Sequence, residues 1–197
     1  MNTVKTTLAT TAVFSDDGKK RYLLTKTWDS TKPNLAIIML APSEASGIAL
    51  DSTTMLVLNN ASRLGFGSVT ILNLFATLND FALKQAALED PENLKVIVSA
   101  AQTADVVIYA PGVGKAKNKL FQERQKQVLT DLQPVAHKLF CLCNEEGTAR
   151  LQHPLSPAVR VWGLSPMKIE ELVEPETVKP DQPKKAKKPA KKEAPAE

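Results

Sequence analysis

Aromatic residues are scarce in this chain of 197 residues, at 5% of the composition, whereas hydrophobic residues together reach 43%. A core with so few rings must consist mainly of Leu, Val, Ile and Ala. No apolar run is long enough to cross a bilayer, and the opening MNTVKTTLATTAVF lacks the apolar segment of a signal peptide. We therefore expect a globular, cytoplasmic protein without a membrane partner.

Cysteine and histidine are also rare, with two residues of each. Cys141 and Cys143 alternate along an apolar run, so a strand would place both on one face as small core thiols. A zinc site would need Cys-x-x-Cys spacing and further ligands. Cofactor motifs are absent as well, because Gly112-Val113-Gly114 lacks the third glycine of a dinucleotide fingerprint. The sequence predicts no disulfide, no metal site and no cofactor.

The positive charge is unevenly placed along the chain. The net charge is +4, and residues 174–197 carry seven lysines against five acids, which leaves the rest of the chain close to neutral. Pro, Lys, Glu and Ala dominate this segment and cannot support a core. We expect a single domain at 1–173 and a disordered tail at 174–197. Six lysines of the tail could bind nucleic acid, or the tail could be a plain solubilising extension: Lys184, Lys185, Lys187, Lys188, Lys191 and Lys192.

Apolar runs of strand length alternate with helical patterns in the body of the chain. Strands at 11–14 and 21–27 flank a turn signal and predict an N-terminal β-hairpin. Four further buried strands are predicted at 35–40, 69–72, 106–110 and 138–142, and helices at 52–64, 91–104 and 115–132. This order predicts an α/β three-layer sandwich with a central four-stranded, mainly parallel sheet.

Polar residues follow the predicted strands, and ligands bind beyond the carboxyl ends of such strands. We take Glu44, Asp51 and His153 as candidate catalytic residues. Plainer roles stay open for each, such as a helix cap for Asp51 and an exposed turn for His153. The candidate ligand-binding residues are Ser43, Asn73 and Gly112. Three lysines open the third predicted helix, where an anion could sit or where they could simply be solvated: Lys115, Lys117 and Lys119.

Five blocks occur in order along the chain: RYLLTKTWD, LAIIMLAPSEAS, RLGFGSVTILNLFA, DPENLKVIVSAAQTADVVIYAPG and CLCNEEGTARLQHPLSP. Over roughly residues 10–157 the chain thereby resembles the bacterial and phage family called domain of unknown function 1643. Members of that family usually carry Asn-Pro-Ser where this chain has Ala41-Pro42-Ser43, and Trp-Gly near Pro111-Gly112. Both departures fall at predicted strand ends.

A more distant resemblance links Pro42-Ser43-Glu44, Asn73 and His153-Pro154 to the uracil-DNA glycosylase superfamily. It implies that Asn73 reads the edge of a flipped base and that His153 stabilises negative charge on that base. The expected function is nucleobase or nucleotide binding in a glycosylase-like pocket that could act on DNA. The alternative is a non-catalytic nucleic-acid-binding or adaptor protein that uses its basic tail. Whether the chain is an enzyme, and its oligomeric state, are left open by the sequence.

Overall fold

The computed structural model describes residues 1–43, 47–78, 90–144, 146–148 and 150–173. Its strands are β1 (Ala9–Phe14), β2 (Arg21–Thr27), β3 (Asn34–Met39), β4 (Ser68–Asn73), β5 (Val106–Tyr109), β6 (Leu139–Cys143) and β7 (Gly163–Pro166). Its helices are α1 (Ser52–Arg63), α2 (Pro91–Thr103), α3 (Lys119–Asp131) and α4 (Glu170–Val173), with 3₁₀ turns η2 (Gln133–Lys138) and η3 (Pro157–Val159).

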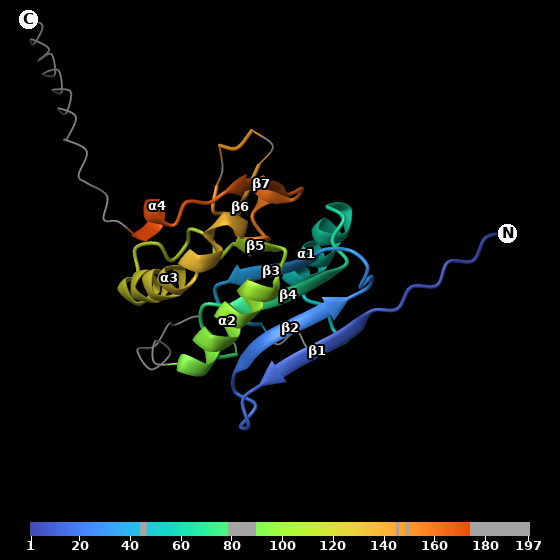
Figure 1. Ribbon diagram of the computed structural model, residues 1–197, viewed down its shortest axis with the longest axis horizontal. Coiled ribbons are helices and arrows are strands. Elements are labelled where there is room, and N and C mark those ends of the chain that lie inside the picture. The colour runs from blue at the N-terminus through green and yellow to red at the C-terminus, as the bar shows by residue number, and fades with distance from the viewer. Residues whose placement is uncertain (44–46, 79–89, 145, 149, 174–197) are drawn as a thin grey trace, which may run out of the picture.

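All of these strands belong to one seven-stranded sheet with the order β1-β2-β4-β3-β5-β6-β7 (Figure 1). Strand β3 pairs in parallel with β4 and β5, and β5 pairs in parallel with β6. The remaining pairs, β1–β2, β2–β4 and β6–β7, are antiparallel. The predicted α/β class is confirmed, but the predicted four-stranded sheet is wrong, because the hairpin and β7 extend the same sheet at both edges.

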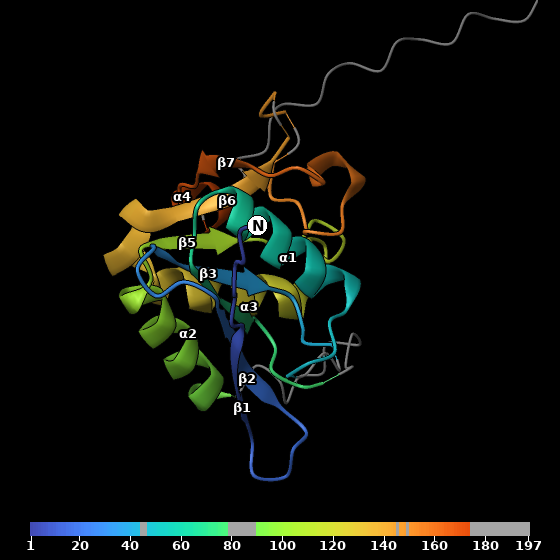
Figure 2. The same cartoon turned by 90° about the vertical axis from the view of Figure 1, so that its right-hand side faces the viewer.

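Helices cover both faces of the sheet (Figure 2). Alternate residues of β3 point to opposite sides, as the pleat requires. Ala36 and Ile38 join the core that contains Ile97 of α2 and Val128 of α3. On the other face, Leu35 and Ile37 pack in the core that contains Val57 of α1 and Val159 of η3. The three-layer arrangement therefore follows from a strand that is apolar on both faces.

Side-chain caps fix where the helices begin. Asp51 accepts the backbone N–H of Thr54 at 2.6 Å and caps α1, and Asp90 accepts that of Asn93 at 3.1 Å and caps α2. The helix starts predicted at residues 52 and 91 are confirmed. The third helix starts later than predicted, because Asn118 accepts the backbone N–H of Phe121 at 3.1 Å and makes Lys119 the first helical residue. The turn that precedes α3 therefore contains Lys115 and Lys117.

An extra residue interrupts the pairing of β2 with β1. Val13 faces Leu23 and Phe14 faces Arg21, so Tyr22 has no partner in β1. Such a bulge reverses the alternation of side chains on one side of it. Arg21 consequently lies on the α1 side of the sheet together with Leu24. In a regular strand these two residues, three positions apart, would lie on opposite faces.

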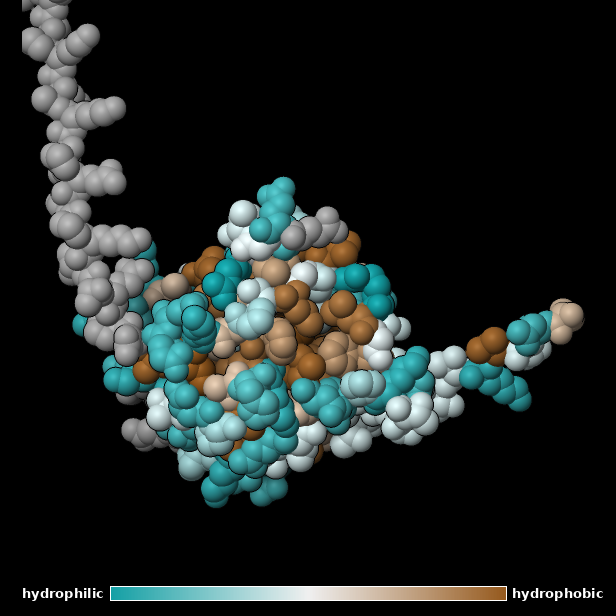
Figure 3. Space-filling view, turned by 45° about the horizontal axis from the view of Figure 1, so that its top comes forward, coloured by the Kyte–Doolittle hydropathy of each residue, from teal (hydrophilic) through white to brown (hydrophobic). Residues whose placement is uncertain are grey.

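Some apolar surface remains exposed on the described residues. Figure 3 shows apolar side chains gathered near the middle of one face, with polar side chains around them. Large exposed apolar residues include Ile48, Val113 and Val161, the last with 51% of its surface accessible. Both cysteines are buried and free, as predicted. In the part of the chain that the structure describes, no helix is long and apolar enough to cross a membrane.

Candidate functional site

Strands β3 and β5 point in the same direction (Figure 2). Residues that follow these strands line a cleft at this carboxyl edge of the sheet. It has two lobes that share Ala41, His153 and Leu155. One lobe, of about 370 Å³, is here called the polar lobe, and it is completed by Arg21, Met39, Ser43, Asp51, Ser52, Thr53 and Thr54. The other, of about 540 Å³, is called the apolar lobe, and it is completed by Leu40, Pro111, Gly112, Val113, Gly114, Lys115, Gln152 and Ser156.

Asp51 lines the polar lobe, and its carboxylate accepts two hydrogen bonds. Its Oδ1 accepts the Thr54 N–H, and its Oδ2 accepts the hydroxyl of Ser43. Burial on its own would raise the pKa of Asp51, but the hydrogen bonds from Ser43 and Thr54, with Arg21 nearby, outweigh it and hold the pKa below its usual range. Asp51 is therefore ionised at neutral pH and remains able to accept further hydrogen bonds.

Arg21 supplies positive charge to the lining of the polar lobe. Its side chain is buried, at 2% exposure, and Nη1 donates to the Ser43 carbonyl at 3.3 Å. Burial lowers the pKa of Arg21, whereas the charge of Asp51 raises it. A guanidinium keeps its charge under such shifts. The bulge in β2 thus places a buried cation beside the loop that contains Ser43.

A second buried cation holds the other end of this loop. Lys26 is 1% exposed, and its Nζ donates to the carbonyl of Gly47 and to Thr10 Oγ1, the latter at 3.0 Å. Burial lowers the pKa of Lys26. Arg21 and Lys26 therefore anchor the chain on both sides of residues 44–46, which are outside the described residues.

His153 lies where the two lobes meet, and a tight turn fixes its ring. The Leu155 N–H donates to His153 Nδ1 at 3.2 Å, and the Ser156 N–H donates to the His153 carbonyl at 2.8 Å. Burial lowers the pKa of His153, although the charge of Asp51 acts in the opposite direction. The neutral ring accepts at Nδ1, so its proton resides on Nε2, which has no hydrogen-bond partner among the described residues.

Two residues near His153, one just before it in the chain and one on the loop that packs against it, have a positive φ that residues with side chains rarely adopt. Leu151 has φ 58°, and Gly112, which faces the histidine, has φ 81°. A Cβ added to Gly112 would lie 3.0 Å from His153 Cβ. Only a residue without a side chain therefore lets the loop after β5 approach the histidine this closely.

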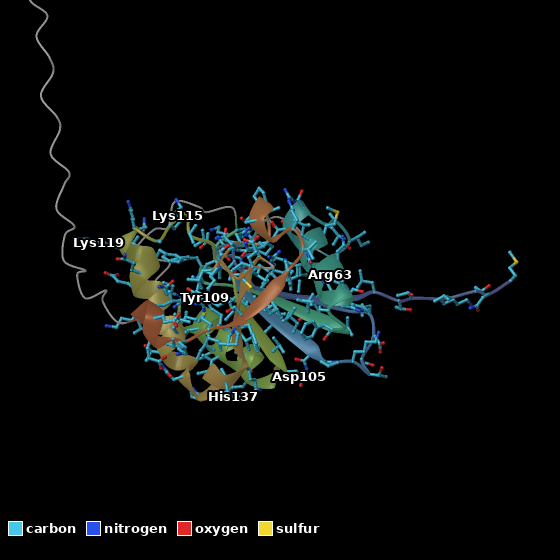
Figure 4. All side chains as sticks on the ribbon, turned by 90° about the horizontal axis from the view of Figure 1, so that it is seen from above. Arg63, Asp105, Tyr109, Lys115, Lys119 and His137 are labelled. Atoms are coloured by element: carbon cyan, nitrogen blue, oxygen red, sulfur yellow. The ribbon has the colours of Figure 1, made fainter. Side chains whose placement is uncertain are left out.

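The walls of the apolar lobe come from Leu40, Pro111, Val113 and Leu155, and Lys115 lies at its edge. Figure 4 places Lys115 and Lys119 on the side of the molecule opposite Asp105 and His137. The latter two precede β5 and β6, so they mark the amino edge of the sheet and lie away from the cleft.

The structure brings together four of the predicted site residues: Ser43, Asp51, Gly112 and His153. Asn73 is at the predicted strand end but is 1% exposed, and it does not line either lobe in the described structure. It pairs in register with Met39, which lines the polar lobe, so the two residues lie side by side on neighbouring strands although Asn73 is buried. The candidate Glu44 is outside the described residues, as is the whole tail with its six candidate lysines. Their predicted roles stay predictions.

Sequence patterns missed several residues of the cleft. Arg21 begins a predicted strand, and nothing in RYLLTKT indicates the bulge that turns it toward the site. Thr53, Val113 and Gln152 come from loops or helix ends whose direction depends on packing. In the described part of the chain, no group of three or more His, Cys, Asp and Glu side chains could hold a metal ion.

Comparison with known proteins identifies the family of this chain. The model of the family described as "Protein of unknown function (DUF1643)" matches residues 21–155, and the chain belongs to this family. No curated protein matches the chain, and no solved structure does. The matched range begins at Arg21 and ends at Leu155, so it contains both of these cleft residues and the described segments between them that line the two lobes.

Proposed function

We propose that the cleft binds a nucleobase or nucleotide and supports hydrolysis of the bond between the base and its sugar. One observation carries this proposal: an ionised carboxylate, Asp51, and a neutral imidazole, His153, line the same lobe. A general base must be unprotonated, and a neutral histidine can donate its Nε2–H. Both groups have these states at neutral pH, because both have lowered pKa values.

The two side chains would act on opposite sides of the reacting bond. Asp51 takes a proton from a water molecule, whose oxygen forms a bond to the anomeric carbon of the sugar. The bond from this carbon to the base nitrogen breaks, and its electron pair passes to the base. His153 Nε2–H donates a hydrogen bond to the negative charge that develops there, and the base then takes up a proton from solvent.

Ser43 and Arg21 support this arrangement without contact to the reacting atoms. The Ser43 hydroxyl donates to Asp51, and Arg21 donates to the Ser43 carbonyl. Both interactions stabilise the ionised carboxylate and fix its position relative to His153. A carboxyl group buried without such donors would have a raised pKa. It would then be protonated over a wider pH range, and in that form it cannot accept a proton from water.

A ligand screen followed by an activity assay tests the proposal. Thermal shift with bases, nucleosides, nucleotides and uracil-containing oligonucleotides should find ligands, and release of free base should be measured for each. Asp51→Asn and His153→Gln should each lower the release rate by about 10²–10⁴-fold. Matched controls at the amino edge, Asp105→Asn and His137→Gln, should leave it unchanged (Figure 4). Equal rates in all four variants would exclude the proposed catalytic pair.

A further inference from the structure

The two lobes of the cleft differ in chemistry. The polar lobe presents the Asp51 carboxylate and the side chains of Ser43 and Thr53 at the start of α1. The apolar lobe presents Pro111, Val113 and Leu155. A ligand that fills both lobes must have one end rich in hydroxyl groups and another end that is flat and apolar on its faces.

The polar lobe suits a sugar. An ionised carboxylate accepts hydrogen bonds from hydroxyl groups, and Asp51 accepts one already from Ser43. Backbone N–H groups at the beginning of α1 add donors, since the first turn of a helix leaves them without partners inside the helix. A sugar ring offers hydroxyl groups that both donate and accept, and it therefore satisfies carboxylate and donors together.

The apolar lobe suits a planar base. Gly112 and Gly114 have no side chains, and a Cβ added to Gly114 would meet no atom within 4 Å. The space beside them is walled by Pro111, Val113 and Leu155, which can contact the faces of a ring. Lys115 also lines this lobe and can donate a hydrogen bond to a ring substituent, whereas the Gln152 side chain there already donates to the Arg150 carbonyl and accepts from Ser156.

His153 lies between these two environments, with Ala41 and Leu155. A ligand with its sugar in the polar lobe and its base in the apolar lobe would place the connecting bond at this junction. The Nε2–H of His153 is then a donor to the base at the atom that receives the electron pair. Asp51 is on the sugar side, where water attacks.

We propose that the cleft recognises a nucleoside unit in one orientation, with the base in the apolar lobe and the sugar in the polar lobe. The inference rests on the proposed function and adds the placement of the two halves of the ligand. A test of this orientation needs substitutions that block each lobe separately. Thr53 and Gly114 offer such positions, since each lines one lobe only.

Calorimetric titration of the full chain with free bases and with the matching nucleosides tests this orientation. Gly114→Leu fills the apolar lobe, so affinity for both free base and nucleoside should fall by more than about tenfold. Thr53→Leu fills the polar lobe, so nucleoside affinity should fall by a similar factor while free-base affinity stays within about twofold. Melting temperatures near that of the parent chain would show that both variants fold.

The outcomes separate the two proposals. If Thr53→Leu loses the free base and Gly114→Leu keeps it, the orientation is wrong although the cleft still binds nucleobases. If both variants bind bases and nucleosides as the parent does, the ligand lies outside these lobes and the orientation is also wrong. If the parent chain binds neither, the proposed function fails and the orientation fails with it.

Discussion

Gly112→Ala is the substitution whose effect follows most directly from the geometry. Gly112 has φ 81°, and an added Cβ would lie 3.0 Å from His153 Cβ and 3.6 Å from His153 N. A side chain in the left-handed region costs about 1–2 kcal/mol, and the close contact must in addition push His153 away. We expect a loss of unfolding free energy of about 1–3 kcal/mol, with displacement of the imidazole.

Gly114→Ala is a matched control two positions away. A Cβ at Gly114 would meet no atom within 4 Å, and its φ is not in the left-handed region. Its stability should therefore stay within about 0.5 kcal/mol of the parent chain, or rise slightly because alanine restricts the unfolded chain.

Thermal and urea unfolding of both variants measure this difference. For a chain of this size, 1 kcal/mol corresponds to about 2–4 °C in Tm, so Gly112→Ala should melt about 2–12 °C lower than the parent. NMR of His153 should show shifted ring resonances in Gly112→Ala and unchanged ones in Gly114→Ala. Equal melting temperatures for the two variants, with His153 unchanged in both, would refute the close approach of the two loops.

Three further predictions concern the acid–base groups and one tight contact. Ser43→Ala removes a donor to Asp51, so the pKa of Asp51 should rise. A depressed carboxyl pKa stabilises the fold above the unfolded value of about 3.9, and this stability is lost as pH falls through the folded pKa, so the midpoint of acid unfolding should move to higher pH. NMR titration of His153 should give a pKa below about 6.5, because burial disfavours the charged ring. Gly67→Ala should cost about 3 kcal/mol or more in unfolding free energy or prevent folding, since its Cβ would lie 1.8 Å from the Asp29 carbonyl oxygen.

Each of these measurements has a control in the same chain. Ser156→Ala removes a hydroxyl that donates to Gln152 and not to a carboxylate, so it should leave acid unfolding where it is. The chain has two histidines, and His137→Gln assigns the His153 resonance by elimination. An acid midpoint that does not move in Ser43→Ala, a pKa of His153 above its ordinary value, or a fully stable Gly67→Ala would each contradict the corresponding geometry.

Most of the secondary structure was predictable because the signals are local. The apolar run around Ile37 is strand-like and buried on both faces, and the two helices predicted to begin at residues 52 and 91 do begin there. The number of strands in the sheet was not predictable. Strand β7 is short, ends at Pro166 and contains Gly163, and such a segment has no periodic pattern from which its pairing with β6 could be inferred.

The candidate site was predictable in part, because the carboxyl ends of parallel strands meet at one edge. This rule placed Ser43, Gly112 and His153 near one cleft. It also selected Asn73, which the structure buries, since a position at a strand end does not determine how deep the side chain lies. Arg21 could not be found, because a bulge depends on the pairing of two strands and leaves no mark in the sequence of one.

The cleft is complete only when distant segments of the chain have packed together. Its walls come from Arg21, from residues 39–41, 43 and 51–54, from residues 111–115 and from residues 152, 153, 155 and 156, and these segments are distant along the chain. Contacts between such distant segments close large loops and slow the folding of a domain. A growing chain that has not yet reached His153 and Leu155 lacks two of the three residues that both lobes share, so ligand binding should report completed synthesis and packing of this part of the chain.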